Sequence, residues 1–277
     1  MSRIQIDFYS DALYANTQAT VILPNSKKDF LANGVRRNSE GKLKVLWLLH
    51  GMGDDHTSWI RNANLERYAL ARGIAVVCPS VPAQSFYTDM VKGPKVFRYI
   101  SEELPAFMRE NFPQFSDRRE DNYIMGQSMG GYGSLKIGLS FPEHYQAIGV
   151  LSSGNLIEME LPPEPEEENF LTPLYGVAGN TFGTSSMKDV LGTKHDVRTL
   201  LEEDLKAGKH IPDIRMTCGT EDFIKGVSDP TAAFLKQKAE ENGFVFTYET
   251  SPGEHNWDFW DHWLPILLDE MGLTSLL

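Results

Sequence analysis

The feature that most constrains the fold lies at residues 126–130, which read Gly-Gln-Ser-Met-Gly. This is the pattern G-x-S-x-G, in which the serine occupies a sharp, strained turn between a strand and a helix. Side chains two residues from the serine would collide in such a turn, and Gly126 and Gly130 carry no Cβ atom. Residues 122–125 are typical of a short buried strand, and residues 131–139 of a helix rich in small residues. The motif therefore predicts a strand, a turn and a helix, with the serine exposed at the turn.

The composition is that of a folded, acidic protein. The 277 residues include 41% hydrophobic residues, which is enough for a substantial core, and they carry a formal net charge of -12. We expect one domain over residues 1–277. Binding to nucleic acid or to anionic membrane surfaces requires clustered Lys and Arg, so the negative charge argues against both partners. We therefore expect no nucleic-acid partner and no membrane partner.

The sequence favours a cytoplasmic location. Residues 1–10 alternate like a strand and lack the apolar region of a secretory signal. The two cysteines, Cys78 and Cys218, each fall within a predicted buried strand. This pattern is typical of structural thiols in a reducing compartment, and a disulfide between the two is not favoured.

Predicted strands alternate with predicted helices along most of the chain. Such alternation indicates a mostly parallel, doubly wound central sheet with helices on both faces. The expected strands are 3–9, 17–23, 43–49, 74–78, 122–125, 147–151, 213–218 and 244–250, and the expected helices are 62–72, 96–111 (kinked or divided at Pro105), 131–139, 196–207, 230–242 and one starting near 257.

Residues 155–194 interrupt this alternation. The segment follows a predicted central strand, and its part at 161–168 is acidic and rich in proline. Insertions of this length within a domain are usually functional or mobile. We therefore expect residues 155–194 to form a cap or lid over the site.

The serine requires two partners, because a serine hydroxyl is a weak nucleophile until a base activates it and an acid orients that base. In the chain order associated with this turn motif, the acid follows the serine and the histidine comes last. Asp222 follows a predicted strand directly, and the carboxyl ends of such strands are where open α/β sheets build their sites. We assign Asp222 as the acid, with the adjacent Glu221 as its competitor.

His255 is the candidate general base. It lies in a loop directly after the predicted strand 244–250, as the chain order requires. His262 falls on the final helix and is interpreted as a packing or surface residue. His195 and His210 flank a helix and are interpreted as solvated.

An oxyanion hole is predicted from residues 50–53, His-Gly-Met-Gly, which follow a buried strand. A loop of this type supplies one backbone N–H group, and the residue after the serine supplies the second. The expected donors are the N–H groups of Met52 and Met129.

We expect no metal and no cofactor. The sequence contains no H-E-x-x-H motif, no paired C-x-x-C motifs and no P-loop, and residues 51–53 lack the third glycine of a dinucleotide fingerprint. Asp54, Asp55 and His56 are interpreted as a solvated turn rather than a metal cluster. The aromatic residues of the last helix are interpreted as core packing: Trp257, Phe259, Trp260 and Trp263.

In combination, the motifs resemble the putative-esterase (esterase D-like) family of α/β-hydrolases, most closely its tributyrin esterase-like and acetyl esterase-like members. The motifs lie at 47–59, 123–145, 218–223 and 253–260. The resemblance implies an α/β-hydrolase fold and a serine carboxylesterase that hydrolyses short acyl esters, acetyl to butyryl, through an acyl-enzyme. It also implies a catalytic triad of Ser128, Asp222 and His255.

Three alternatives remain open. One is a thioesterase that resembles S-formylglutathione hydrolases, and another is a feruloyl or acetyl-xylan type of esterase acting on carbohydrate-linked esters. The third is a catalytically silent binding protein on the same scaffold. The expected partner is a small-molecule ester, and a homo-oligomer is possible.

Overall fold

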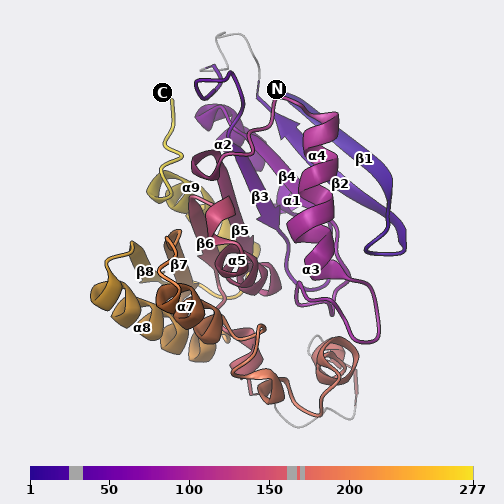
Figure 1. Ribbon diagram of the computed structural model, residues 1–277, viewed down its shortest axis with the longest axis vertical. Coiled ribbons are helices and arrows are strands. Elements are labelled where there is room, and N and C mark those ends of the chain that lie inside the picture. The colour runs from indigo at the N-terminus through magenta and orange to yellow at the C-terminus, as the bar shows by residue number, and fades with distance from the viewer. Residues whose placement is uncertain (25–33, 161–166, 169–171, 277) are drawn as a thin grey trace.

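An eight-stranded sheet forms the centre of the computed structural model (Figure 1). The strand order is β1-β2-β4-β3-β5-β6-β7-β8, and the strands from β4 to β8 run parallel to one another. The strands are β1 Ser2–Ser10, β2 Ala15–Leu23, β3 Val45–Leu49, β4 Ala75–Pro79, β5 Asn122–Gln127, β6 Ala147–Leu151, β7 Asp213–Gly219 and β8 Phe246–Ser251. The structure describes residues 1–24, 34–160, 167–168 and 172–276.

The central strands are apolar on both faces because helices cover both faces. In β3, Val45, Trp47 and Leu49 belong to one core cluster, whereas Leu46 and Leu48 belong to a second. The first cluster includes residues of α4, α5, α7 and α8, and the second includes residues of α1, α2 and α9. The predicted mostly parallel sheet with helices on both sides is thus confirmed.

The helices follow the predicted pattern with local differences. Their bounds are α1 Ser58–Asn62, α2 Leu65–Arg72, α3 Val96–Arg98, α4 Leu104–Asn111, α5 Met129–Ser140, α6 Thr172–Tyr175, α7 Val197–Lys206, α8 Lys225–Asn242 and α9 Trp257–Glu270. The expected helix 62–72 is shorter, because the helical conformation is interrupted between α1 and α2. At this point Asp261 of α9 accepts the backbone N–H of Asn64 at 2.8 Å. A π-helical turn, Tyr99–Glu103, separates α3 from α4 just before Pro105, whose ring cannot fit a regular helix interior.

Helix α8 begins five residues earlier than expected and contains Pro230. The proline costs one backbone hydrogen bond within the helix. Two features of the first turns offset this cost: Val227 and Ser228 are buried, and Lys225 forms an ion pair with Asp229 at 2.6 Å.

The carboxyl ends of the parallel strands face the segment 155–194. Figure 1 shows both chain termini toward one end of the sheet and residues 172–194 beyond the opposite end. The described part of the segment folds into short turns at Leu156–Glu158, Ala178–Phe182 and Met187–Val190, besides α6. Residues 161–166 and 169–171 of the predicted cap lie outside the described residues.

Both cysteines are buried free thiols, Cys78 in β4 and Cys218 in β7. No helix within the described ranges has the length and apolar character needed to span a bilayer.

Candidate active site

Ser128 lies between β5 and α5 in a strained backbone conformation, with φ 52° and ψ -123°. A positive φ in a non-glycine residue costs on the order of 1–3 kcal/mol and persists only where the surroundings impose it. A Cβ atom on Gly130 would lie 2.5 Å from the carbonyl oxygen of Leu49, and one on Gly126 would overlap the backbone of Gly130. The two glycines therefore permit the tight approach of β5, α5 and β3 that the turn requires.

The structure brings Ser128, His255 and Asp222 into one hydrogen-bonded row. His255 Nε2 lies 2.9 Å from Ser128 Oγ, and His255 Nδ1 lies 2.9 Å and 3.1 Å from the two carboxylate oxygens of Asp222. An ionised carboxylate only accepts hydrogen bonds, so the imidazole proton resides on Nδ1 and Nε2 accepts from the serine hydroxyl. The three residues follow β5, β8 and β7 respectively, on the same side of the sheet.

The Asp222 carboxylate is buried yet remains ionised. Burial alone would raise its pKa, but hydrogen bonds from His255, Ser152 and the backbone N–H of Ile224 outweigh burial, so the pKa is lower than usual. Trp260 Nε1 in turn donates to Ser152 Oγ at 2.9 Å. A negative charge is thus held against the far side of the His255 ring.

Glu221, the competing acid, does not contact His255. Its exposed carboxylate accepts the backbone N–H of Gly253 at 2.7 Å and the hydroxyl of Thr220 at 2.7 Å. The bond from Gly253 lowers the pKa of Glu221. Glu221 therefore ties the loop after β7 to the loop that carries His255, whereas Asp222 is the carboxylate directed at the imidazole.

The other late histidines lie away from this row. His210 and His262 are exposed, as expected. The interpretation of His195 as solvated is wrong: His195 is partly buried, its Nδ1 lies 3.1 Å from Lys136 Nζ, and its carbonyl accepts the hydroxyl of Tyr132 at 2.6 Å. Burial, together with the nearby Lys136, lowers the pKa of His195 to about 3. The chain before α7 packs on α5, a contact that sequence periodicity does not reveal.

The loop after β3 places Met52 beside Ser128, and Met52 and Met129 both line the same cavity. His50 holds the start of this loop: its Nε2 accepts the N–H of Val81 at 3.0 Å, so its Nδ1 donates to the Gly51 carbonyl at 2.7 Å. Burial lowers the pKa of His50, which keeps the ring neutral. Met129 is the first residue of α5, where backbone N–H groups have no partner within the helix. The sequence motif indicated the loop but not the role of His50 in holding it.

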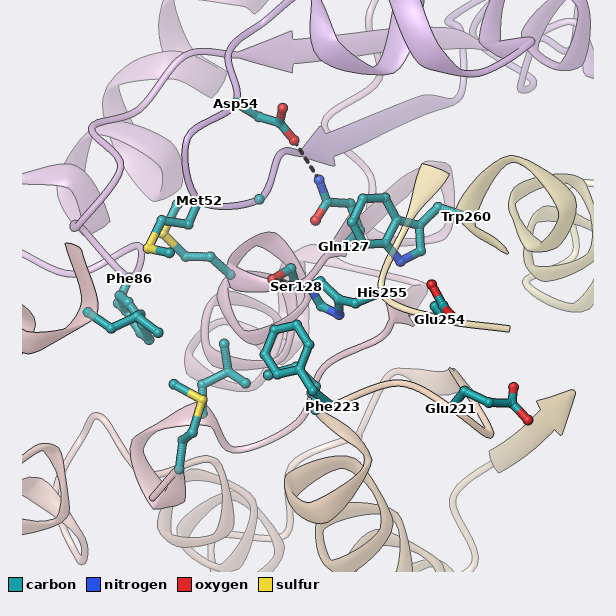
Figure 2. Close-up of a pocket in the computed structure, with 16 residues that line it drawn as sticks. Met52, Asp54, Phe86, Gln127, Ser128, Glu221, Phe223, Glu254, His255 and Trp260 are labelled. Carbon is teal, nitrogen blue, oxygen red and sulfur yellow. Dashed lines mark hydrogen bonds between the residues drawn. The ribbon is translucent and has the colours of Figure 1, made fainter. Parts of the chain in front are cut away.

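A cavity of about 470 Å³ opens over Ser128 and His255. Figure 2 shows Met52 and Phe86 on one side of Ser128, and His255 with Glu254 on the other. Most of the lining is apolar, and several apolar side chains come from the segment 155–194. The apolar side chains are Met52, Phe86, Met129, Leu156, Met159, Leu174, Phe223, Ile224 and Trp260.

Two aromatic rings that sequence reasoning missed enclose the His255 imidazole. The ring of Trp260 meets it edge-on at 5.0 Å between centroids, and the ring of Phe223 lies at 4.6 Å. Core packing was therefore an incomplete interpretation of Trp260, which is buried and also lines the cavity. Their sequence positions carried a signal, because Phe223 directly follows Asp222 and Trp260 lies five residues after His255.

The triplet Asp54, Asp55 and His56 does not converge on one point. Asp54 accepts the side-chain amide of Gln127 at 2.8 Å, whereas His56 Nδ1 lies 2.7 Å from the hydroxyl of Thr20. Over the part of the chain that the structure describes, no group of three or more His, Cys, Asp and Glu side chains is arranged to hold a metal ion.

Comparison with known proteins shows the family of the chain. The family described as "Putative esterase" matches residues 10–270. The chain belongs to this esterase family. The family predicted from the four motifs is therefore confirmed, and the protein is a carboxylic ester hydrolase.

Individual relatives of this esterase span its whole length. It is 30% identical over 277 residues to an acetyl esterase of Caldicellulosiruptor saccharolyticus, covering 99% of this chain and 100% of that protein. The substrate-bound fluorophosphonate-binding serine hydrolase F of Staphylococcus aureus superposes with a TM-score of 0.80 at 28% identity, covering 99% of both chains. An S-formylglutathione hydrolase of Staphylococcus aureus superposes with a TM-score of 0.74 at 27% identity, covering 98% of both chains. The α/β-hydrolase fold of the esterase is thereby confirmed.

Proposed function

We propose that the esterase is a serine carboxylesterase that hydrolyses short-chain acyl esters, acetyl to butyryl, through an acyl-enzyme intermediate. The observation that carries this proposal is the unbroken row of hydrogen bonds from Ser128 through His255 to Asp222 at a largely apolar cavity. The names of two relatives, an acetyl esterase and a fluorophosphonate-binding serine hydrolase, also support a nucleophilic serine and a small acyl group.

In the first half-reaction, Ser128 Oγ attacks the ester carbonyl carbon while its proton passes to His255 Nε2. The carbonyl oxygen becomes an oxyanion, which the backbone N–H groups of Met52 and Met129 stabilise, each by about 3 kcal/mol. His255 then returns the proton to the alcohol oxygen as the bond between carbon and that oxygen breaks. The alcohol leaves, and the acyl group remains on Ser128.

In the second half-reaction, His255 takes a proton from water, and the resulting hydroxide attacks the acyl carbon. The second oxyanion forms in the same place. As it collapses, the bond between the acyl carbon and Ser128 Oγ breaks, His255 returns its proton to Oγ, and the acid is released. Throughout, the ionised Asp222 stabilises the imidazolium form of His255 and holds its ring in position.

The preference for short acyl groups rests on what closes the cavity. Leu156, Met159 and Leu174 all come from the segment 155–194 and line the cavity. We propose that this segment is a cap whose apolar side chains set the length of acyl chain that fits. A cavity of about 470 Å³ lies in the lower part of the range found for small-molecule sites.

The test is a series of p-nitrophenyl esters from acetate to decanoate, with kcat/KM measured for wild type, Ser128→Ala and Ser140→Ala. Wild type and Ser140→Ala, a control at the far end of α5, should hydrolyse acetate to butyrate rapidly and longer esters poorly. Ser128→Ala should lose at least about 10⁴-fold in kcat. Mass spectrometry of the quenched wild-type reaction should find the acyl group on Ser128.

Two results would count against the proposal. One is ester hydrolysis that persists unchanged in a folded Ser128→Ala variant. The other is a folded wild-type enzyme that turns over no ester in the series and whose Ser128 fails to react with a fluorophosphonate probe.

A further inference from the structure

The charged side chains that line the described cavity are all acidic. Asp54, Glu221 and Glu254 contribute carboxylates, and no Lys or Arg lies among the lining residues. Figure 2 shows Glu254 beside His255, with Glu221 farther out on the same side and Asp54 across the cavity. Both oxygens of Glu221 accept hydrogen bonds, from Gly253 and Thr220, and one oxygen of Asp54 accepts the amide of Gln127. The exposed carboxylate of Glu254 and the second oxygen of Asp54 are therefore the groups that a ligand would meet.

Gln127 adds an acceptor that has no partner in the part of the chain that the structure describes. Its side chain is 1% exposed and lines the cavity next to Ser128. The side-chain Nε2 donates to Asp54 at 2.8 Å. Because a carboxylate only accepts hydrogen bonds, this contact fixes the orientation of the amide, and Oε1 is the end that does not bind Asp54. Within the described residues, Oε1 is buried with no hydrogen-bond partner. An unpaired buried acceptor is costly, so a ligand that donates a hydrogen bond to it would relieve that cost.

The proton path decides which half of the ester meets these groups. His255 must return the proton to the alcohol oxygen, so the alcohol lies on the His255 side of Ser128, beside Glu254. The opposite side, where Figure 2 shows Met52 and Phe86, is apolar and suits the acyl chain. The alcohol half is thus placed beside the Glu254 carboxylate, in a cavity whose other charged side chains are also acidic.

We propose, on the basis of the function proposed above, that the esterase selects esters by their alcohol part. That part is uncharged or cationic and carries a hydrogen-bond donor, such as a hydroxyl or ammonium group. Glu254 and Asp54 set the charge preference, and Gln127 Oε1 receives the donor. Alcohols and thiols with net negative charge, including glutathione, are disfavoured as leaving groups.

The substrate test uses four para-substituted phenyl acetates that share one acyl group: 4-methyl, 4-hydroxymethyl, 4-ammoniomethyl and 4-carboxymethyl. Each kcat/KM is divided by the rate constant for hydroxide-catalysed hydrolysis of the same ester, which removes differences in leaving-group reactivity. The ammoniomethyl ester should exceed the carboxymethyl ester about tenfold at low ionic strength, and added salt should reduce this ratio. The hydroxymethyl ester should exceed the methyl ester about threefold.

Three variants assign these preferences to residues. Glu254 is exposed, and Glu254→Gln should lower the ratio of kcat/KM for the ammoniomethyl ester over the carboxymethyl ester about threefold. The control Glu110→Gln, which removes one exposed carboxylate from α4, should leave this ratio unchanged. Gln127→Met should abolish the advantage of the hydroxymethyl over the methyl ester. Because Gln127 is buried, its thermal unfolding is compared with that of wild type.

The outcomes separate this proposal from the proposed function. Ser128-dependent hydrolysis of the 4-methyl ester supports the esterase mechanism whatever the charge preference. Equal or reversed rates for the two charged esters, or a ratio that Glu254→Gln does not change, would overturn the proposed selection. If no ester turns over, calorimetry with Ser128→Ala still measures selection: the ammoniomethyl ester should bind more tightly than the carboxymethyl ester, and the reverse order would overturn it.

Discussion

At the scale of single residues, two adjacent carboxylates have different environments. Asp222 is 4% exposed and lies against His255, whereas Glu221 is exposed and binds the backbone of Gly253. The sequence placed both directly after a strand and left the choice between them open. The burial of Asp222 and the direction of its side chain toward His255 distinguish it from Glu221.

Replacing the two carboxylates one at a time should separate their roles. Asp222→Asn should lower kcat for p-nitrophenyl acetate by about 10⁴-fold, because the amide cannot hold the His255 proton on Nδ1 or stabilise the imidazolium. Glu221→Gln should lower kcat less than about tenfold, since it removes charge but retains an acceptor for Gly253. Similar losses in both variants would contradict the assignment of Asp222 as the acid.

At the scale of elements, α5 has the strained serine at its start and a buried lysine in its middle. Lys136 is 2% exposed, and its Nζ donates to the hydroxyl of Thr88 and contacts His195. Burial lowers the pKa of Lys136 to about 7, with Asp89 opposing the shift and Lys194 adding to it. This lysine joins α5 to the chain that leads out of the segment 155–194.

The low pKa of Lys136 predicts how stability depends on pH. In the unfolded chain a lysine has a pKa of about 10.4, so between about pH 7 and 10 the unfolded state binds more protons than the folded state. Lys136 therefore makes the free energy of unfolding rise with pH across this window and costs the most stability below it. Thermal unfolding should find Lys136→Met more stable than wild type at about pH 6, with the difference shrinking by about pH 9. Parallel pH profiles for the two proteins would contradict this expectation.

At the scale of the whole molecule, the described part of the segment 155–194 contacts the loop after β4 and lines the cavity at the carboxyl ends of the strands. It packs on the loop after β4, where the Thr181 hydroxyl donates to the Gln84 carbonyl at 2.6 Å and the N–H of Val91 donates to the Thr181 carbonyl at 3.0 Å. It also contributes Leu174, which is 6% exposed, to the cavity wall. Its place in the fold is consistent with a cap that limits the acyl chain.

Shortening one cap side chain should change the acyl preference. Leu174→Ala should raise the ratio of kcat/KM for p-nitrophenyl hexanoate over acetate by about fivefold, because the removed methyl groups leave room for longer chains. Leu191→Ala is the matched control in the same segment, since Leu191 is 40% exposed and does not line the cavity. If both variants retained the wild-type ratio, the cap would not set the chain length.

Local sequence patterns predicted most of the elements. Apolar runs such as Val45–Leu49 predicted the buried strands, and the expected helix 62–72 ends where α2 ends, at Arg72, followed by Gly73 in a left-handed conformation. Where the prediction differed, a tertiary contact was responsible: Asp261 interrupts the first predicted helix, and packing of Val227 extends α8 across a proline.

By itself, the sequence determined the order of strands and helices and the strained turn at Ser128, because periodicity and glycine sterics act between neighbours in the chain. It also named Asp222 and His255 as candidates by their position after strands. Only the tertiary structure decided which carboxylate meets the imidazole and that Trp260 borders it. It alone also showed that Gln127, which lines the cavity, has a buried Oε1 with no hydrogen-bond partner among the described residues. Each of these depends on atoms from different strands meeting at one edge of the sheet, and local patterns carry no information about such distances.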